Sequence, residues 1–97
     1  MNKQTVLDRL KDNIEEIRQR FSVKTIAIFG SVARDEAADN SDVDVLVTFE
    51  QKARFDVFMD LKFYLEELLK TGVDLVTDKA LRPQIQKTIE QEIIHVA

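Results

Sequence analysis

The sequence contains no cysteine and only one histidine, His95, among its 97 residues. The absence of cysteine excludes disulfide scaffolds, zinc sites built from thiolates and cysteine nucleophiles. A single histidine cannot form a His-rich metal site, and it offers no convincing Ser-His-Asp triad. Any metal site in this chain is therefore expected to use oxygen ligands.

Long apolar runs are also missing from the sequence. No run approaches the roughly 18 residues that are needed to cross a bilayer. The first 20 residues are charged throughout and lack the apolar segment of a signal peptide. We therefore expect a cytoplasmic protein without membrane contact. Its 14 basic and 18 acidic residues give a formal charge of −4, which argues against direct nucleic-acid binding.

The length predicts a single domain that spans residues 1–97, because domains usually contain about 100–200 residues. Such a short chain buries only about 60–65% of the surface that its unfolded form exposes, so its core is thin. Glycine and proline are scarce: the sequence has only Gly30, Gly72 and Pro83. No linker, repeat or low-complexity tract divides the chain.

The hydrophobic spacing predicts helices and strands in an interleaved order. An apolar stripe at spacings of three and four predicts one helix from Thr5 to Phe21, capped by Thr5. The other expected elements are strands at 24–29, 42–49 and 73–77, a short helical turn at 31–36, and a last helix from Arg82-Pro83. This order predicts an α/β (α+β) class with a small β-sheet flanked by helices.

The segment from Arg54 to Lys70 is predicted to form a second long helix. Ten of the fifteen residues from Phe55 to Leu69 are apolar, which is more than one buried stripe requires. A thin domain can hardly cover a helix that is apolar nearly all round. We therefore expect this helix to contact another molecule, either a partner protein or a second copy of the chain.

Acidic residues gather between positions 35 and 50, where there are six acids and no base. Asp42 and Asp44 are two apart on a predicted strand, so their side chains leave the same face about 6–7 Å apart. Asp74, on another predicted strand, could reach that face. Three such carboxylates repel one another unless cations lie between them, and these hard ligands favour Mg²⁺ or Mn²⁺. The alternative is a solvated strand end without a ligand.

Gly30 and Ser31 lie where a predicted strand ends and a short helix begins. Free backbone N–H groups at a helix start suit phosphates, and glycine lets the backbone come close to a ligand. The Ser31 hydroxyl can add a hydrogen bond, and Arg34 can donate to a phosphate oxygen one turn later. The alternatives are an ordinary strand-to-helix turn and a surface arginine.

A family signature contains these same residues. Gly30-Ser31, ten intervening residues, Asp42-Val43-Asp44 and a later strand aspartate together resemble the signature of the DNA polymerase β-like nucleotidyltransferase superfamily. Over nearly its whole length the chain is most similar to minimal nucleotidyltransferase (MNT) domains. The resemblance implies a mixed sheet flanked by helices. It also implies that Asp42 and Asp44 hold two Mg²⁺ ions, that Asp74 binds the catalytic ion, and that Gly30 and Ser31 hold the phosphates of ATP.

The resemblance further implies an Mg²⁺-dependent adenylyltransferase, in which an acceptor hydroxyl attacks the α-phosphate and pyrophosphate leaves. Stand-alone MNT domains are commonly antitoxins that pair with HEPN ribonuclease toxins, so it implies a hetero-oligomer and AMP transfer to a toxin tyrosine. The alternative is a weak or inactive MNT-fold module that neutralises the toxin by direct contact. Transfer to a small molecule or RNA is disfavoured, because the sequence shows neither a second domain nor a basic groove.

One position departs from the family's pattern. Many relatives have glycine where this chain has Asp35. Glycine permits a positive φ, which costs other residues energy, although aspartate is among the more tolerant. Asp35 also adds negative charge near the expected triphosphate site, so we expect it to weaken catalysis without changing the fold.

Overall fold

The computed structural model describes residues 2–36, 42–80, 86–87 and 92–97. Within them, one mixed sheet has the strand order β3-β2-β1-β4. Strand β1 pairs antiparallel with both β2 and β4, and β2 pairs parallel with β3. The strands are β1 (Val23–Phe29), β2 (Val43–Phe49), β3 (Val73–Thr77) and β4 (Ile94–His95). The mixed sheet and the α/β class agree with the prediction.

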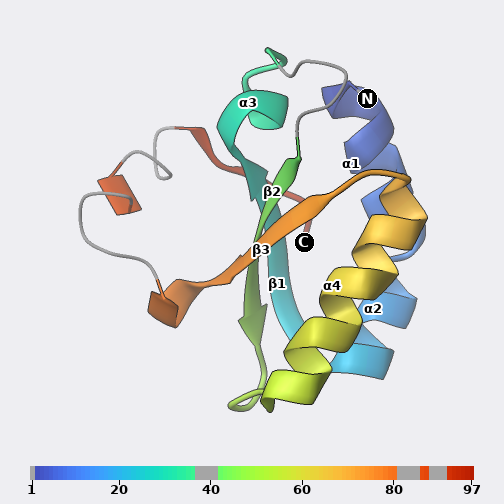
Figure 1. The fold of residues 1–97 in the computed structure, drawn as a ribbon, viewed down its shortest axis with the longest axis vertical. Coiled ribbons are helices and arrows are strands. Elements are labelled where there is room, and N and C mark those ends of the chain that lie inside the picture. The colour runs from blue at the N-terminus through green and yellow to red at the C-terminus, as the bar shows by residue number, and fades with distance from the viewer. Residues whose placement is uncertain (1, 37–41, 81–85, 88–91) are drawn as a thin grey trace.

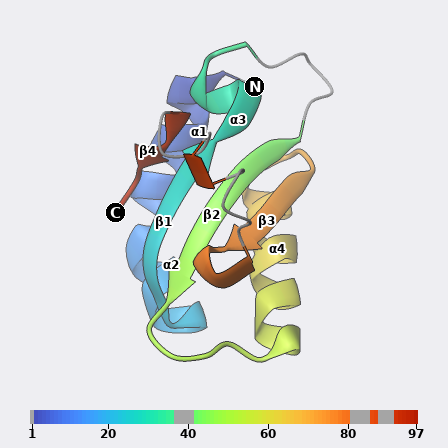
Figure 2. The same ribbon diagram turned by 90° about the vertical axis from the view of Figure 1, so that its left-hand side faces the viewer.

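Helices cover one face of this sheet. Helices α1 (Lys3–Asp12), α2 (Ile14–Phe21) and α4 (Phe55–Leu69) lie together on that face, and the core forms between them and the strands (Figure 1). Figure 2 looks onto the opposite face, where the strands lie in front of the helices. Along β2, Val43, Val45 and Val47 are buried toward the helices. The alternate residues, which include Asp44, therefore belong to the other face.

The first helix differs from the prediction because it is divided in two at Asn13. Helix α1 begins earlier than expected, and its cap is Asn2, whose side chain accepts a 2.8 Å hydrogen bond from the Thr5 N–H. The Asn13 side chain donates to the carbonyl of Arg9 at 2.8 Å. Asparagine competes in this way with the helical backbone, so the first helix ends at Asp12 and α2 starts anew.

Most of the predicted last helix lies outside the described residues, and the sequence did not predict the strand that follows it. Arg82 and Pro83 are among the residues that are not described. Of the residues of this segment that are described, 86–87 and Glu92 are helical. The chain then forms β4, which pairs Ala27 with His95 and Ile28 with Ile94. The residues around β4 are apolar and mostly β-branched, which favours a strand. The isoleucines before β4 recur every four residues, and this spacing favours a helix instead.

Helix α4 begins and ends within one residue of its predicted bounds, and Leu61, Leu65 and Leu69 are fully buried. Two large apolar side chains stay outside the core: Phe55 is 78% exposed and Phe63 is 56% exposed. The expected contact between this helix and another molecule stays a prediction, and these two side chains mark where it would form.

Candidate functional site

Two of the three predicted aspartates face each other on neighbouring strands. Asp44 is the second residue of β2 and Asp74 the second residue of β3, and the parallel register pairs them directly. Hydrogen-bonded strands lie about 4.8 Å apart, so their carboxyl groups meet on the face opposite the helices. Asp42 lies just before β2, and its charge also acts on Asp44. The structure thus brings the three predicted acids to one end of the sheet.

This acidic cluster shifts the protonation of Asp44. Burial is the largest cause that raises the pKa of the Asp44 carboxyl from 3.8 to about 6, and the charge of Asp74 and a hydrogen bond with Asp74 add to it. The charge of Asp42 acts in the same direction, whereas Arg34 opposes it. The cluster therefore carries more negative charge than its surroundings stabilise. Binding of either a proton or a cation would reduce the repulsion between the carboxylates.

The donor chemistry of the cluster fits a hard divalent cation. All three side chains offer carboxylate oxygens, which are the ligands that Mg²⁺ and Mn²⁺ prefer. Over the described ranges, no three acidic or histidine side chains already surround a common point as ligands. Instead Asp44 and Asp74 lie opposite each other in the strand register, and their proximity helps to raise the pKa of Asp44. Asp42, Asp44 and Asp74 stay the predicted ligands.

Both glycines of the chain lie against these carboxylates. Gly30 has a φ of +73°, and a Cβ atom there would overlap Oδ2 of Asp44 and lie 3.1 Å from its Cγ. A Cβ atom at Gly72 would lie 3.0 Å from Cγ of Asp42. Gly30 was expected to let a phosphate approach, but the structure shows that it also makes room for Asp44. The sequence pattern gave no sign that Gly72 belongs to the site.

The signature turn is short and tightly hydrogen-bonded. Helix α3 (Gly30–Ala33) follows β1 directly, and the carbonyl of Ser31 accepts a 2.8 Å hydrogen bond from the Glu36 N–H. The carbonyl of Gly30 accepts from the Arg34 N–H at 3.1 Å. Gly30 and Ser31 therefore stand at the end of β1, beside the Asp44 carboxylate, where the sequence places them. Their contact with phosphate stays a prediction.

Arg34 is held by two carboxylates that the sequence reasoning missed. Its Nη1 donates to Glu92 at 2.7 Å, and its Nε donates to Glu36 at 3.1 Å. The hydrogen bond to Glu36, followed by the one to Glu92, raises the pKa of the guanidinium above its ordinary value. Glu92 lies 58 residues away in the sequence, so no local pattern could have indicated it.

Asp35 adopts the positive φ that its place in the signature predicts. Its φ is +59°, in the left-handed region that favours glycine. Its side chain accepts a long hydrogen bond, 3.4 Å, from the Lys3 N–H at the start of α1. The aspartate therefore connects the signature turn to the first helix.

Replacing Asp35 by glycine is expected to stabilise the protein by about 0.5–1 kcal/mol, because glycine adopts this φ without steric cost. Urea unfolding measures the change. The control is Asp35→Ala, which loses the same hydrogen bond but keeps a Cβ atom, and we expect it to be less stable than the wild type. A glycine variant less stable than the wild type would show that the contact with Lys3 outweighs the backbone strain.

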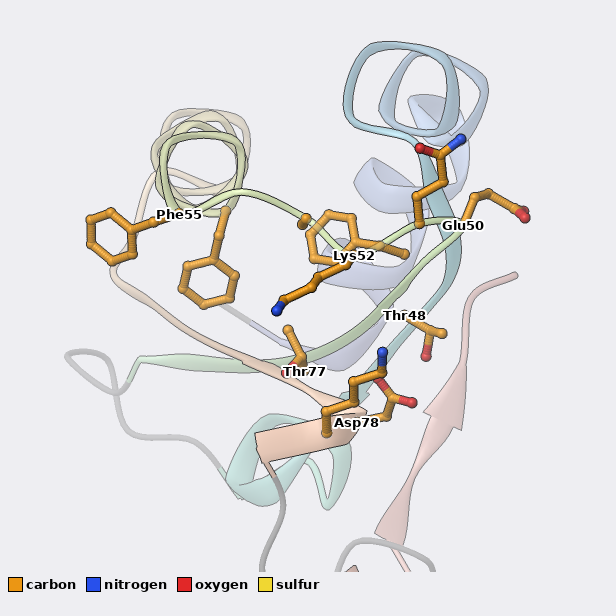
Figure 3. A pocket seen from close by; sticks show the side chains of 11 residues that line it. Thr48, Glu50, Lys52, Phe55, Thr77 and Asp78 are labelled. Atoms are coloured by element: carbon orange, nitrogen blue, oxygen red, sulfur yellow. The ribbon is translucent and has the colours of Figure 1, made fainter.

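A separate pocket lies away from the acids, at the far ends of β2 and β3. Figure 3 shows it between the 50–54 loop, the first turn of α4 and the 3₁₀ turn η1 (Asp78–Ala80). Its volume is about 480 Å³, and Phe55, Phe58 and Lys52 are among its lining residues. None of the six predicted site residues lines it.

The described helices were also compared with a membrane span. None of them is both long enough and apolar enough to cross a membrane.

Comparison with known proteins identifies the family. The model of the nucleotidyltransferase domain matches residues 10–96. The chain is 45% identical over 82 residues to the protein adenylyltransferase MntA of Thermococcus cleftensis, with 84% of this chain and 83% of that protein covered. A solved structure assigned as a minimal nucleotidyltransferase is 34% identical, with a TM-score of 0.81 over 97% of this chain and 95% of that one.

A more distant neighbour has the same fold. It belongs to a complex of a tri-AMPylated HEPN toxin from Shewanella oneidensis with an MNT antitoxin, at 16% identity and a TM-score of 0.68. The alignment covers 98% of this chain and 71% of that one. The family model and the relatives cover most of the chain. The chain therefore belongs to the nucleotidyltransferase domain family.

Proposed function

We propose that this protein is an Mg²⁺-dependent adenylyltransferase that transfers AMP from ATP to a tyrosine hydroxyl of a partner HEPN toxin and thereby neutralises it. One observation carries the proposal: Asp44 and Asp74 meet in register beside Gly30, with Asp42 near enough for its charge to act on Asp44. A protein that only binds a partner has no need of a cluster with so much unfavourable charge. The relative from Thermococcus supports the reaction class.

Each residue of the site would have a separate role in the reaction. Asp42 and Asp44 would hold two Mg²⁺ ions, and Asp74 would bind the catalytic ion and help to deprotonate the acceptor hydroxyl. The ions supply charge neutralisation on the phosphates when bound. Gly30, Ser31 and Arg34 would hold the phosphates of ATP. The hydroxyl oxygen then bonds to the α-phosphorus, the bond to the β-phosphate oxygen breaks, and pyrophosphate leaves.

The partner is inferred from the neighbours and from α4. The distant neighbour comes from a complex between a HEPN toxin and an MNT antitoxin, so we propose a toxin of that type as the partner and acceptor. Phe55 and Phe63 on α4 offer exposed apolar surface for a hetero-oligomer, although a homodimer would use the same surface. The cytoplasmic location that the sequence predicts is consistent with such a pair.

AMP transfer tests the proposed function directly. The protein is incubated with Mg²⁺-ATP and its co-purified partner, and the intact mass of the partner is measured. We expect a mass gain of one or more AMP units, located by peptide mapping on a tyrosine, and no gain with the Asp42→Asn/Asp44→Asn protein. An unchanged partner mass in a stable complex would contradict the enzymatic proposal.

The second candidate function is neutralisation by contact alone. The observation that favours it is the exposed apolar surface of α4, which lies across the sheet from the acids and does not depend on them. The Asp42→Asn/Asp44→Asn protein separates the two functions. If that protein still forms the complex and still suppresses the ribonuclease, contact suffices; if it binds without suppression, AMP transfer is needed.

Mg²⁺ is expected to raise the unfolding temperature by roughly 6–11 °C at ten times its dissociation constant. Binding to the folded state at that concentration adds about 1.4 kcal/mol, and each kcal/mol corresponds to about 4–8 °C in a domain of this size. Thermal unfolding with and without Mg²⁺ measures the shift. The Asp42→Asn/Asp44→Asn protein should show none, and an equal shift in that protein would place the ion elsewhere.

A further inference from the structure

The C-terminal strand brings an acidic residue to the signature turn. Strand β4 pairs with the part of β1 that leads into Gly30, with Ile28 opposite Ile94 (Figure 2). Glu92 lies two residues before β4, and its carboxylate reaches Arg34 in the turn that follows Gly30. A further backbone hydrogen bond holds this strand on β1, since the Val96 N–H donates to the Ile26 carbonyl at 2.9 Å. Strand β4 therefore holds the chain against β1 within two residues of Glu92.

Glu92 holds the guanidinium of Arg34 from one side, and Glu36 holds it from another. They accept from Nη1 at 2.7 Å and from Nε at 3.1 Å, so two points fix the plane of the guanidinium. The Glu92 side chain is 25% exposed and that of Glu36 is 67% exposed, so solvent screens the Glu92 contact less. In the described part of the chain, Nη2 has no protein acceptor, so both of its N–H groups can donate to a ligand.

Arg34 lies near the acids, because its charge acts on Asp44. We propose that Glu92 is a positioning residue for the nucleotide: through Nη1 it orients Arg34 so that Nη2 donates to a phosphate oxygen. This inference rests on the proposed function. An alternative is that Glu92 competes with phosphate for Arg34. Competition would require Glu92 to withdraw when phosphate binds, but β4 holds the chain two residues further on against β1, and Nη2 is available without any movement.

Equilibrium binding of Mg²⁺-ATP to the isolated full chain, measured by calorimetry, tests the proposal. We expect Glu92→Ala to weaken binding about tenfold and Glu92→Gln, which keeps an oxygen acceptor but loses the charge, to weaken it about threefold. Glu67→Gln removes one exposed acid on α4 and is the control for net charge, with unchanged affinity. In AMP transfer with the partner, the KM for ATP should rise in the same proportion, while kcat changes less than about threefold.

A double variant tests whether Glu92 acts through Arg34. In the Arg34→Ala background, Glu92→Ala should change Mg²⁺-ATP affinity less than twofold, because there is no guanidinium left to orient. Equal losses in the two backgrounds, or binding by Glu92→Ala that matches or exceeds the wild type, would overturn the inference. Thermal unfolding of Glu92→Gln checks that the variant is folded.

Binding and transfer separate this inference from the proposed function. A wild-type chain that binds Mg²⁺-ATP but transfers no AMP to its partner would contradict the proposed function, and the binding measurements would still decide the role of Glu92. A wild-type chain that transfers AMP while Glu92→Ala binds nucleotide equally well would contradict the role of Glu92 alone. A wild-type chain that binds no Mg²⁺-ATP would overturn both.

Discussion

Replacing Asp44 by asparagine is expected to lower AMP transfer at least about a thousandfold while making the metal-free protein more stable. The loss corresponds to about 4 kcal/mol of transition-state stabilisation, which is within the range expected for removal of a charged ligand from a metal-assisted reaction. The gain in stability arises because asparagine has no charge to place beside Asp74 and Asp42. Opposite effects on activity and stability are typical of a residue retained for function.

The stability effect depends on pH in a direction that the protonation of Asp44 determines. Folding raises the pKa of its carboxyl from 3.8 to about 6, so the folded state binds this proton more tightly than the unfolded state does. The stability of the wild type should therefore fall as the pH rises from about 4 to 7. The full difference in pKa corresponds to roughly 3 kcal/mol, which solvent screening of this half-buried group reduces to about 1 kcal/mol.

Urea unfolding in the presence of a metal chelator at pH 3.5 and pH 7.5 measures this effect. The Asn variant should match the wild type at the lower pH and exceed it by about 1 kcal/mol at the higher pH. Asp60→Asn, which removes an exposed acid on α4, controls for net charge and should show no such divergence. If Asp44→Asn is the less stable protein at pH 7.5, repulsion within the acidic cluster does not destabilise the wild type, and the charge argument is wrong.

The position of Asp44 was predictable because a strand has a period of two. Alternation along β2 places its valines in the core and its even-numbered residues on the other face, which a single sequence shows directly. The pairing of Asp44 with Asp74 was not predictable in the same way. It depends on the parallel register of β2 and β3, and the 29 residues between these aspartates contain a complete helix. The sequence could indicate only that both strands carry an aspartate.

The features that the sequence did not predict, strand β4 and the contact of Glu92 with Arg34, both depend on contacts between distant segments. The pairing of β4 with β1 determines the conformation of Ile94 and His95, and the spacing of isoleucines before them favours a helix. Glu92 reaches Arg34 only because of that pairing. The positive φ of Asp35, by contrast, was expected, since a position where relatives have glycine indicates a backbone requirement. Local chemistry was readable from the sequence, and pairing at the sheet edge was not.

Replacing Gly30 by alanine is expected to destabilise the protein by about 2–5 kcal/mol and to abolish AMP transfer. A φ of +73° costs an L-residue about 1–2 kcal/mol, and overlap of the new methyl group with the Asp44 carboxylate adds about 1–3 kcal/mol. Urea unfolding measures the loss of stability, and the intact mass of the partner measures the loss of AMP transfer. Gly72→Ala is the matched control: it also meets a carboxylate, but Asp42 is exposed and can turn away, so a smaller loss is expected.

A second substitution separates the two causes of the Gly30 effect. Asp44→Ala removes the carboxylate that the methyl group would meet, but it leaves the backbone at Gly30 with the same φ. Gly30→Ala should therefore cost only about 1–2 kcal/mol in an Asp44→Ala background, and the difference from its cost in the wild type measures the overlap. An equal cost in both backgrounds would show that Asp44 moves aside freely. In that case Gly30 would be needed for its φ alone, and close packing of the signature turn against the acid would contribute nothing to the site.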